Sequence, residues 1–294
     1  MDELLLPFQY DFMNKAMFAA TFVGGVCAML SAYLMLKGWS LIGDALSHSI
    51  VPGVAAAYMM GIPYVFGAFF SGLLASAAMG FIKAKTNLRE DAIIGLIFTS
   101  FFALGLFMVS LNPASVNVQN IVLGNILGVS DEDIIQMLLI AGISLVVLIF
   151  TWKDIMVTFF DENHAKTVGI NTKFKNILFF TLLSACTIAA LQTVGALLVI
   201  GLIVTPGATA YLLCDRFGQL IVVSTIIGSV TSFVGAYASF FLDGATGGII
   251  VLLQTFIFII VFLFAPKYGL LAARAKIRKA SKILLGEKTQ KSGK

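Results

Sequence analysis

Long apolar runs dominate this 294-residue chain and constrain its fold more than any motif does. A run of about 20 apolar residues is long enough to cross the hydrocarbon core of a bilayer as a helix. A helix also satisfies its own backbone hydrogen bonds, which lipid does not do. We therefore expect an all-α, polytopic membrane protein, with apolar runs at residues 14–36, 40–61, 64–82, 92–110, 133–152, 176–193, 195–214, 219–241 and 248–265.

The composition predicts one membrane domain followed by a short basic tail. Hydrophobic residues make up 59% of the chain and charged residues 12%, against about 25% charged in soluble proteins. We expect a transmembrane domain over residues 1–266 and no separate soluble domain. Residues 267–294 hold nine Lys and Arg against one acid, Glu287, so the net charge of +4 comes from this tail, which outweighs a small acidic excess in the rest of the chain. Such a tail is typical of a cytoplasmic segment that contacts membrane lipid, so we expect no nucleic-acid partner.

Loop charges predict which side of the membrane each turn faces. Lysine and arginine gather at residues 83–89 and 153–175, which we expect in the cytoplasm. Residues 111–130 contain neither and are expected outside. Nine crossings would leave the N-terminus outside, whereas merging two early runs would give eight crossings with both ends inside. The sequence therefore predicts eight or nine transmembrane helices.

Asp44 and His48 most need an explanation, because both lie within one apolar run. Their spacing places both side chains on one face of a helix, about 6 Å apart along its axis. Ionisable groups at membrane depth are costly unless they face protein, water or an ion. A carboxylate and an imidazole together suit a divalent metal such as manganese, iron or zinc. Two ligands leave the metal shell incomplete, so the others would come from a second chain, carbonyls near Pro52, or water.

Two other interpretations of this pair stay open. The two side chains can form a hydrogen-bonded pair that only locks neighbouring helices together. They can also relay protons, because an imidazole changes its charge near neutral pH. We favour a functional role over a purely structural one, because ionisable groups inside a membrane are functional by default.

Proline–glycine pairs interrupt two of the apolar runs, at Pro52-Gly53 and at Pro206-Gly207. A proline inside a helix removes one backbone hydrogen bond and leaves a carbonyl without its donor. Lipid offers no replacement donor for that carbonyl. We therefore expect both breaks to face protein or a water-filled cavity.

The cytoplasmic loop at residues 159–171 has the pattern of a short capped helix. Asp161 and Glu162 are placed to cap and charge its start, and Gly169 is placed to end it. Such a helix outside the membrane is either a docking element for a partner or an ordinary connector, and the residues alone favour neither. We expect His164 to be a solvated residue rather than a ligand.

Several kinds of catalytic site are missing from the sequence. It has no Gly-x-x-x-x-Gly-Lys-Ser/Thr phosphate loop, no Gly-x-Ser-x-Gly elbow and no His-Glu-x-x-His helix, so we expect no ATP binding of that type and no hydrolase chemistry. Cys27, Cys186 and Cys214 occur singly in apolar segments. We interpret them as buried packing thiols rather than as disulfide or metal ligands.

Three segments carry a resemblance to a known family. Residues 37–53 read Lys-Gly-Trp-Ser-Leu-Ile-Gly-Asp-Ala-Leu-Ser-His-Ser-Ile-Val-Pro-Gly, residues 123–128 read Leu-Gly-Asn-Ile-Leu-Gly, and residues 204–210 read Val-Thr-Pro-Gly-Ala-Thr-Ala. From Pro7 to Pro266, the sequence resembles the membrane permease subunits of bacterial ATP-binding-cassette importers for manganese, zinc and iron, of the metal-ion ABC-3 type. The resemblance implies an importer permease fold in the bacterial inner membrane.

The resemblance also implies partners and roles. Asp44 and His48 occupy the positions of the family's metal-contacting pair. Residues 161–170 match the coupling helix, with Ala165-x-x-x-Gly169 similar to the Ala-x-x-x-Gly core of importer coupling loops. The implied assembly is a homodimeric or paired permease with two cytoplasmic ATPase subunits and an extracytoplasmic metal-binding protein. The permease itself would be no enzyme and would hold no permanent cofactor.

We therefore expect vectorial transport of a divalent metal, with manganese ahead of iron and zinc. The preference for manganese rests on the Lys-Gly-Trp-Ser-Leu lead-in at residues 37–41, which looks like that of manganese and iron permeases. One alternative is a proton-coupled secondary transporter that uses Asp44 and His48 as its relay. Another is a structural membrane subunit that transports nothing.

Overall fold

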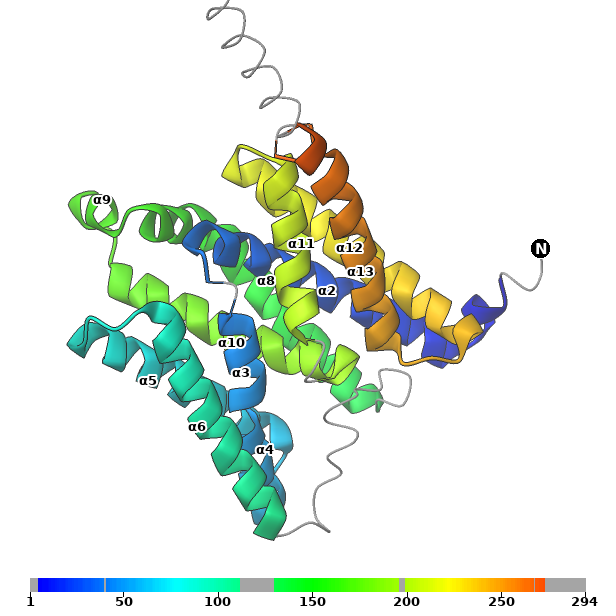
Figure 1. Ribbon diagram of the computed structural model, residues 1–294. Coiled ribbons are helices and arrows are strands. Elements are labelled where there is room, and N and C mark those ends of the chain that lie inside the picture. The colour runs from blue at the N-terminus through cyan, green and yellow to red at the C-terminus, as the bar shows by residue number, and fades with distance from the viewer. Residues whose placement is uncertain (1–4, 40, 112–129, 196–198, 267, 273–294) are drawn as a thin grey trace, which may run out of the picture.

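A computed structural model describes residues 5–39, 41–111, 130–195, 199–266 and 268–272. The family-like segment at residues 123–128 and nearly all of the basic tail lie outside these residues. Within the described part the regular structure is helical, as expected (Figure 1). The helices are η1 (Leu6–Gln9), α2 (Asp11–Lys37), α3 (Ile42–Ser49), α4 (Val51–Met60), α5 (Tyr64–Lys85), α6 (Glu90–Leu111), α8 (Asp131–Phe160), α9 (Glu162–Thr167), α10 (Thr172–Val194), α11 (Val199–Leu213), α12 (Phe217–Leu242) and α13 (Thr246–Phe264).

Seven of the described helices are long and apolar enough to span a bilayer, namely α2, α5, α6, α8, α10, α12 and α13. The expected count of eight or nine is therefore too high for unbroken spans. The two expected spans that fall short are those that contain Pro-Gly pairs. The first is divided into α3 and α4, of 8 and 10 residues, and the second is α11, of 15 residues.

Contacts between helix ends show how the chain alternates in direction. Lys15 near the start of α2 pairs with Asp131 at the start of α8, with 3.0 Å between the charged atoms. At the opposite end of α2, the Tyr33 ring lies 5.0 Å from the ring of Phe217, which begins α12. The start of α2 and the end of α13 thus lie at opposite ends of the bundle. This order fits an odd number of passes from α2 to α13, and the external position of the N-terminus stays a prediction.

Helix α2 lies at the centre of the bundle, where 78% of its most apolar stretch is buried. Figure 1 shows α3 to α6 grouped on one side of α2, and α11 to α13 on the other. Small residues allow the close approach of these helices. A Cβ atom at Gly24 would overlap the Ser232 side chain of α12, and one at Gly207 would overlap the Ser31 backbone. Close backbone contact of this kind is what holds helices together in lipid.

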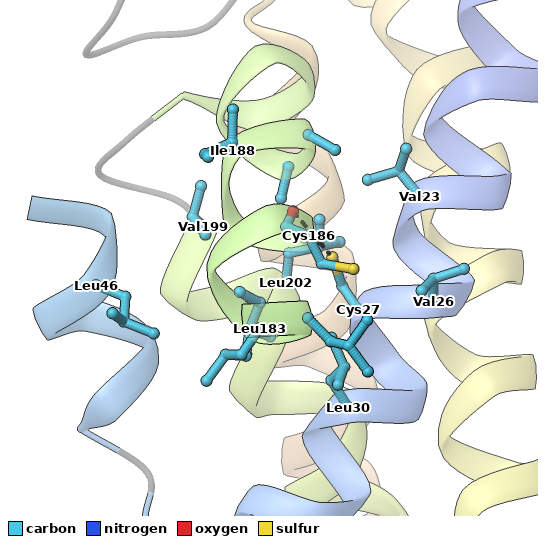
Figure 2. Close-up of a cluster of buried hydrophobic side chains, with 14 of the residues drawn as sticks. Val23, Val26, Cys27, Leu30, Leu46, Leu183, Cys186, Ile188, Val199 and Leu202 are labelled. Carbon is cyan, nitrogen blue, oxygen red and sulfur yellow. Dashed lines mark hydrogen bonds between the residues drawn. The ribbon is translucent and has the colours of Figure 1, made fainter. Parts of the chain in front are cut away.

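An apolar core fills the space where α2, α10 and α11 meet α3 (Figure 2). The Cys27 thiol donates a hydrogen bond to the Cys186 carbonyl at 3.7 Å, and both side chains are almost fully buried. Their interpretation as packing thiols is confirmed. Cys214 is only half-buried, at the cytoplasmic end of α11.

Serine hydroxyls from neighbouring helices bond backbone groups next to both proline breaks. Ser71 of α5 donates to the Ser49 carbonyl at 2.6 Å, beside Pro52. In α11, Ser31 donates to the Val204 carbonyl at 3.1 Å and accepts from the Gly207 N–H at 3.0 Å. The expectation that the breaks face protein is confirmed, because unsatisfied backbone groups are costly in a membrane.

Candidate functional site

Asp44 and His48 form a close pair on α3. His48 Nε2 lies 3.3 Å from Asp44 Oδ1, as the four-residue spacing predicts. The side chain of His48 is 13% exposed and that of Asp44 is 36% exposed. The imidazole is therefore held inside the protein, whereas the carboxylate keeps a free face that can meet an ion or water.

Two phenylalanines of α6 hold the imidazole in place. The rings of Phe98 and Phe102, one turn apart, each lie 5.1 Å from the His48 ring and meet it edge-on. Phe98 and Phe102 also stack on each other with centroids 6.0 Å apart, so both rings pack against the same side of the imidazole and restrict its rotation. Sequence reasoning missed these two residues, because phenylalanine in an apolar helix carries no distinguishing signal.

One chain supplies only part of a metal shell. Among the described residues, no group of three or more His, Cys, Asp or Glu side chains is close enough to hold a metal. The Asp44–His48 pair offers two possible ligands, and a complete shell would need others from outside the described residues.

Helix α9 has the caps that the sequence predicts. The Asp161 carboxylate accepts hydrogen bonds from the N–H groups of Asn163 and His164 at 2.9 and 3.0 Å. At the other end Gly169 has a φ of 84°, and the Ile170 N–H bonds back to the Ala165 carbonyl at 2.9 Å. This left-handed ending stops the helix after six residues.

Helix α9 is anchored by one side and solvated on the others. Ala165 is fully buried, whereas His164 and the rest of the helix are exposed, as expected for His164. Glu162 forms an ion pair with Lys166 at 2.8 Å, and the lysine hydrogen bond lowers the pKa of this carboxyl group. The pair therefore supports α9 at neutral pH, and its contribution is lost as the pH falls through the lowered pKa of Glu162.

Trp39 links the surroundings of α9 to the helices of the Asp44–His48 pair. Its ring stacks on Phe180 of α10 and meets Phe159, near the end of α8, edge-on, with centroids 5.4 and 5.5 Å away. Its indole N–H donates to the Glu90 carboxylate, which begins α6. Trp39 is only 7% exposed and lies three residues before α3. A packed path therefore runs from the end of α8, which precedes α9 in the chain, through Trp39 to α6 and to the segment that enters α3.

The fold and these features define a class of protein. A bundle with seven long apolar helices in its described part, a partly buried carboxylate–imidazole pair and a capped helix outside the apolar spans is a multi-pass membrane transport permease. The chain belongs to the ABC 3 transport family, whose model matches residues 9–265. The family inferred from residues 37–53 is thus confirmed.

Named relatives agree with this family. The chain is 63% identical to the "Probable iron transport system membrane protein" of Haemophilus influenzae, over 94% of this chain and 98% of the relative. It is 47% identical to the "Manganese transport system membrane protein MntB" of Synechocystis, over 92% of this chain and 88% of the relative. The solved structure titled "PsaBC from Streptococcus pneumoniae in complex with Fab" is 32% identical, with a TM-score of 0.83 over 93% of this chain and 99% of that one. That likeness confirms the permease fold.

Proposed function

We propose that this protein is the permease subunit of an ATP-driven importer for divalent manganese or iron, and that Asp44 and His48 contact the ion. The observation that carries the proposal is the 3.3 Å pair, with its imidazole packed against two phenylalanines and its carboxylate partly exposed. A carboxylate and an imidazole are suitable ligands for both metals. An incomplete shell from each chain also favours transport, because an ion that binds too tightly does not leave.

The proposed assembly contains two copies of the chain, two cytoplasmic ATPase subunits and an extracytoplasmic metal-binding protein. A second copy would add a second Asp44–His48 pair and so double the number of possible metal ligands. Helix α9 is the proposed contact with the ATPase, because it is capped, mostly exposed and anchored through the buried Ala165. In this mechanism ATP-driven closure of the ATPase pair moves α9, and the movement passes through Trp39 to α3 and α6.

The names of the relatives support iron and manganese as substrates. A relative at 63% identity is named for iron and one at 47% for manganese. Manganese, favoured by the residues at 37–41, stays a prediction. Uptake of each ion in competition with the other, by cells that lack their own importers, would measure the preference.

Uptake is expected to need ATP and not a proton gradient. The test reconstitutes the permease with its ATPase and binding protein in vesicles and follows manganese entry with and without ATP. Collapsing the proton gradient with a protonophore should leave the ATP-driven rate unchanged. Uptake that follows the gradient without ATP would instead support the proton-relay alternative for Asp44 and His48.

Replacing Trp39 with phenylalanine should weaken the link between ATP hydrolysis and transport. Phenylalanine keeps a ring against Phe159 and Phe180 but removes the donor to Glu90. A hydrogen bond to a charged group contributes about 1.5–3 kcal/mol, so we expect metal uptake to fall by about tenfold or more. The number of ATP molecules hydrolysed per ion should rise, which a loss of folded protein alone would not produce. Trp152→Phe, at the other tryptophan of the chain, is the matched control and should leave this ratio unchanged.

A further inference from the structure

A cavity of about 520 Å³ lies at the cytoplasmic end of the bundle, apart from the Asp44–His48 pair. It is bounded by the end of α2, the end of α5, the starts of α6 and α10, and the first residue of α9. Three lysines line it, namely Lys37, Lys83 and Lys173, together with the two acids Glu90 and Glu162. The proposed transport mechanism gives this cavity no role.

The charges of the cavity are not balanced. Glu90 is already bonded to Lys83 and to the Trp39 indole, and Glu162 is bonded to Lys166, which lies outside the cavity lining. Within the described part of the chain, neither Lys37 nor Lys173 has a carboxylate within ion-pair distance. Lys37 instead lies over the rings of Trp39 and Phe159, at 5.4 and 5.8 Å. Lys37 and Lys173 therefore line the cavity without a direct ion pair and can meet an anion, while Lys37 also acts at longer range on Glu90 and Glu162.

Apart from Asn176 and the Trp39 indole N–H, the rest of the cavity wall is apolar, and it reaches the exposed surface of the bundle. Ile177 lines the cavity from α10 and is 62% exposed. Gly80 lines it from α5, and a Cβ atom there would meet open space. The site is thus an apolar slot at the membrane surface with lysines at its mouth. Inorganic phosphate would contact only the lysines, whereas an anionic lipid would contact both the lysines and the apolar wall.

We propose that this cavity binds an anionic phospholipid of the cytoplasmic leaflet. Its phosphate would lie at Lys37 and Lys173, and part of an acyl chain would lie against Ile177. Basic pockets between helices on the cytoplasmic side are suited to such headgroups. A zwitterionic lipid carries the same phosphate with an added cation, so the two lysines disfavour it. Because Glu162 of α9 forms part of the rim, a bound lipid would also steady the helix proposed to contact the ATPase.

The test measures lipid binding to the purified full-length permease in detergent, by native mass spectrometry and by thermal unfolding. Phosphatidylglycerol, phosphatidylcholine and inorganic phosphate are compared. We expect phosphatidylglycerol to stay bound and raise the unfolding temperature, with little effect from the other two. An equal effect of inorganic phosphate would overturn the lipid assignment, and equal binding of phosphatidylcholine would show that the lysines do not select the headgroup.

Lysine variants test whether phospholipid binding depends on this cavity or on the general positive charge of the cytoplasmic surface. Each of Lys37→Gln and Lys173→Gln should weaken phosphatidylglycerol binding by about fivefold, because one basic residue near the surface contributes about 1 kcal/mol. Lys153→Gln is the matched control, because it removes a cytoplasmic lysine that does not line the cavity and should leave binding unchanged. Wild-type binding by the double lysine variant, or an equal loss in Lys153→Gln, would refute the proposal.

A second variant fills the cavity without changing its charge. Gly80→Leu adds a side chain where the backbone leaves open space and suits a helix better than glycine, so the fold should be kept. Phosphatidylglycerol binding should fall by about tenfold or more, as expected when roughly 1.4 kcal/mol of acyl-chain contact is lost. Unchanged binding would show that the slot is not used. These measurements need neither metal nor ATPase, so their failure would leave the proposed transport function standing.

Discussion

Asp44→Asn and His48→Phe are each expected to abolish metal uptake while the permease still assembles in the membrane. Asparagine keeps the size of aspartate but removes the negative charge that a divalent ion needs. Phenylalanine fills the space beside Phe98 and Phe102 but offers no ligand nitrogen. Loss of even a supporting group around a metal typically costs about 10- to 100-fold, so we expect a loss of about 100-fold or more for a direct ligand.

The measurement is uptake of radioactive manganese into vesicles, with the amount of assembled complex checked by size-exclusion chromatography. Asp243→Asn is the matched control, because Asp243 lies after α12 with a φ of 46°, a conformation that asparagine tolerates. It removes the same charge away from the proposed site and should transport normally. If Asp44→Asn and His48→Phe also transported normally, the pair would be no metal site. If they lowered the unfolding temperature without lowering uptake, the pair would be a structural lock.

Ala165→Leu is expected to release the ATPase from the permease. Ala165 is fully buried where α9 meets the bundle, so a larger side chain must push this six-residue helix away. Overpacking of this kind typically costs about 1–3 kcal/mol. We therefore expect the ATPase to bind roughly tenfold or more weakly and ATP-driven uptake to fall in parallel. The unfolding temperature of the permease alone should change little, because α9 lies outside the long helices.

Co-purification of the ATPase with each permease variant measures this effect. Ala103→Leu is the matched control, because Ala103 is an exposed position of α6 where added apolar volume meets only lipid. It should retain full ATPase binding. If Ala165→Leu also retained full binding and full uptake, α9 would be a connector and not the docking element.

Features that depend on neighbours along the chain could be predicted from the sequence. Asp161 and Gly169 delimit α9 because a carboxylate bonds the N–H groups two and three residues later, and glycine adopts the left-handed ending without strain. Asp44 and His48 meet because four residues make about one helical turn. The proline breaks at residues 52 and 206 could also be predicted, because a proline removes a hydrogen bond within its own helix.

Features that depend on distant residues could not be predicted in this way. Ser31 bonds backbone groups next to the break in α11 from 173 to 176 positions away in the chain, and Trp39 reaches Glu90 across 51 positions. Nothing in the sequence around either residue marks its partner. The count of long spans also depended on how far α11 and the α3–α4 pair extend as regular helix, which is why it was predicted too high.

The sequence by itself determined the class of protein: apolar length made it a membrane bundle, local caps made α9 a separate helix, and four-residue spacing made a carboxylate–imidazole pair. Only the tertiary structure decided what surrounds these features, including the phenylalanines that hold His48, the serines that bond the backbone next to the breaks and the lysine-lined cavity beside α9. The physical reason is that caps and periodicity arise from bonds within one or two helical turns. Packing instead brings together side chains whose positions no local pattern encodes.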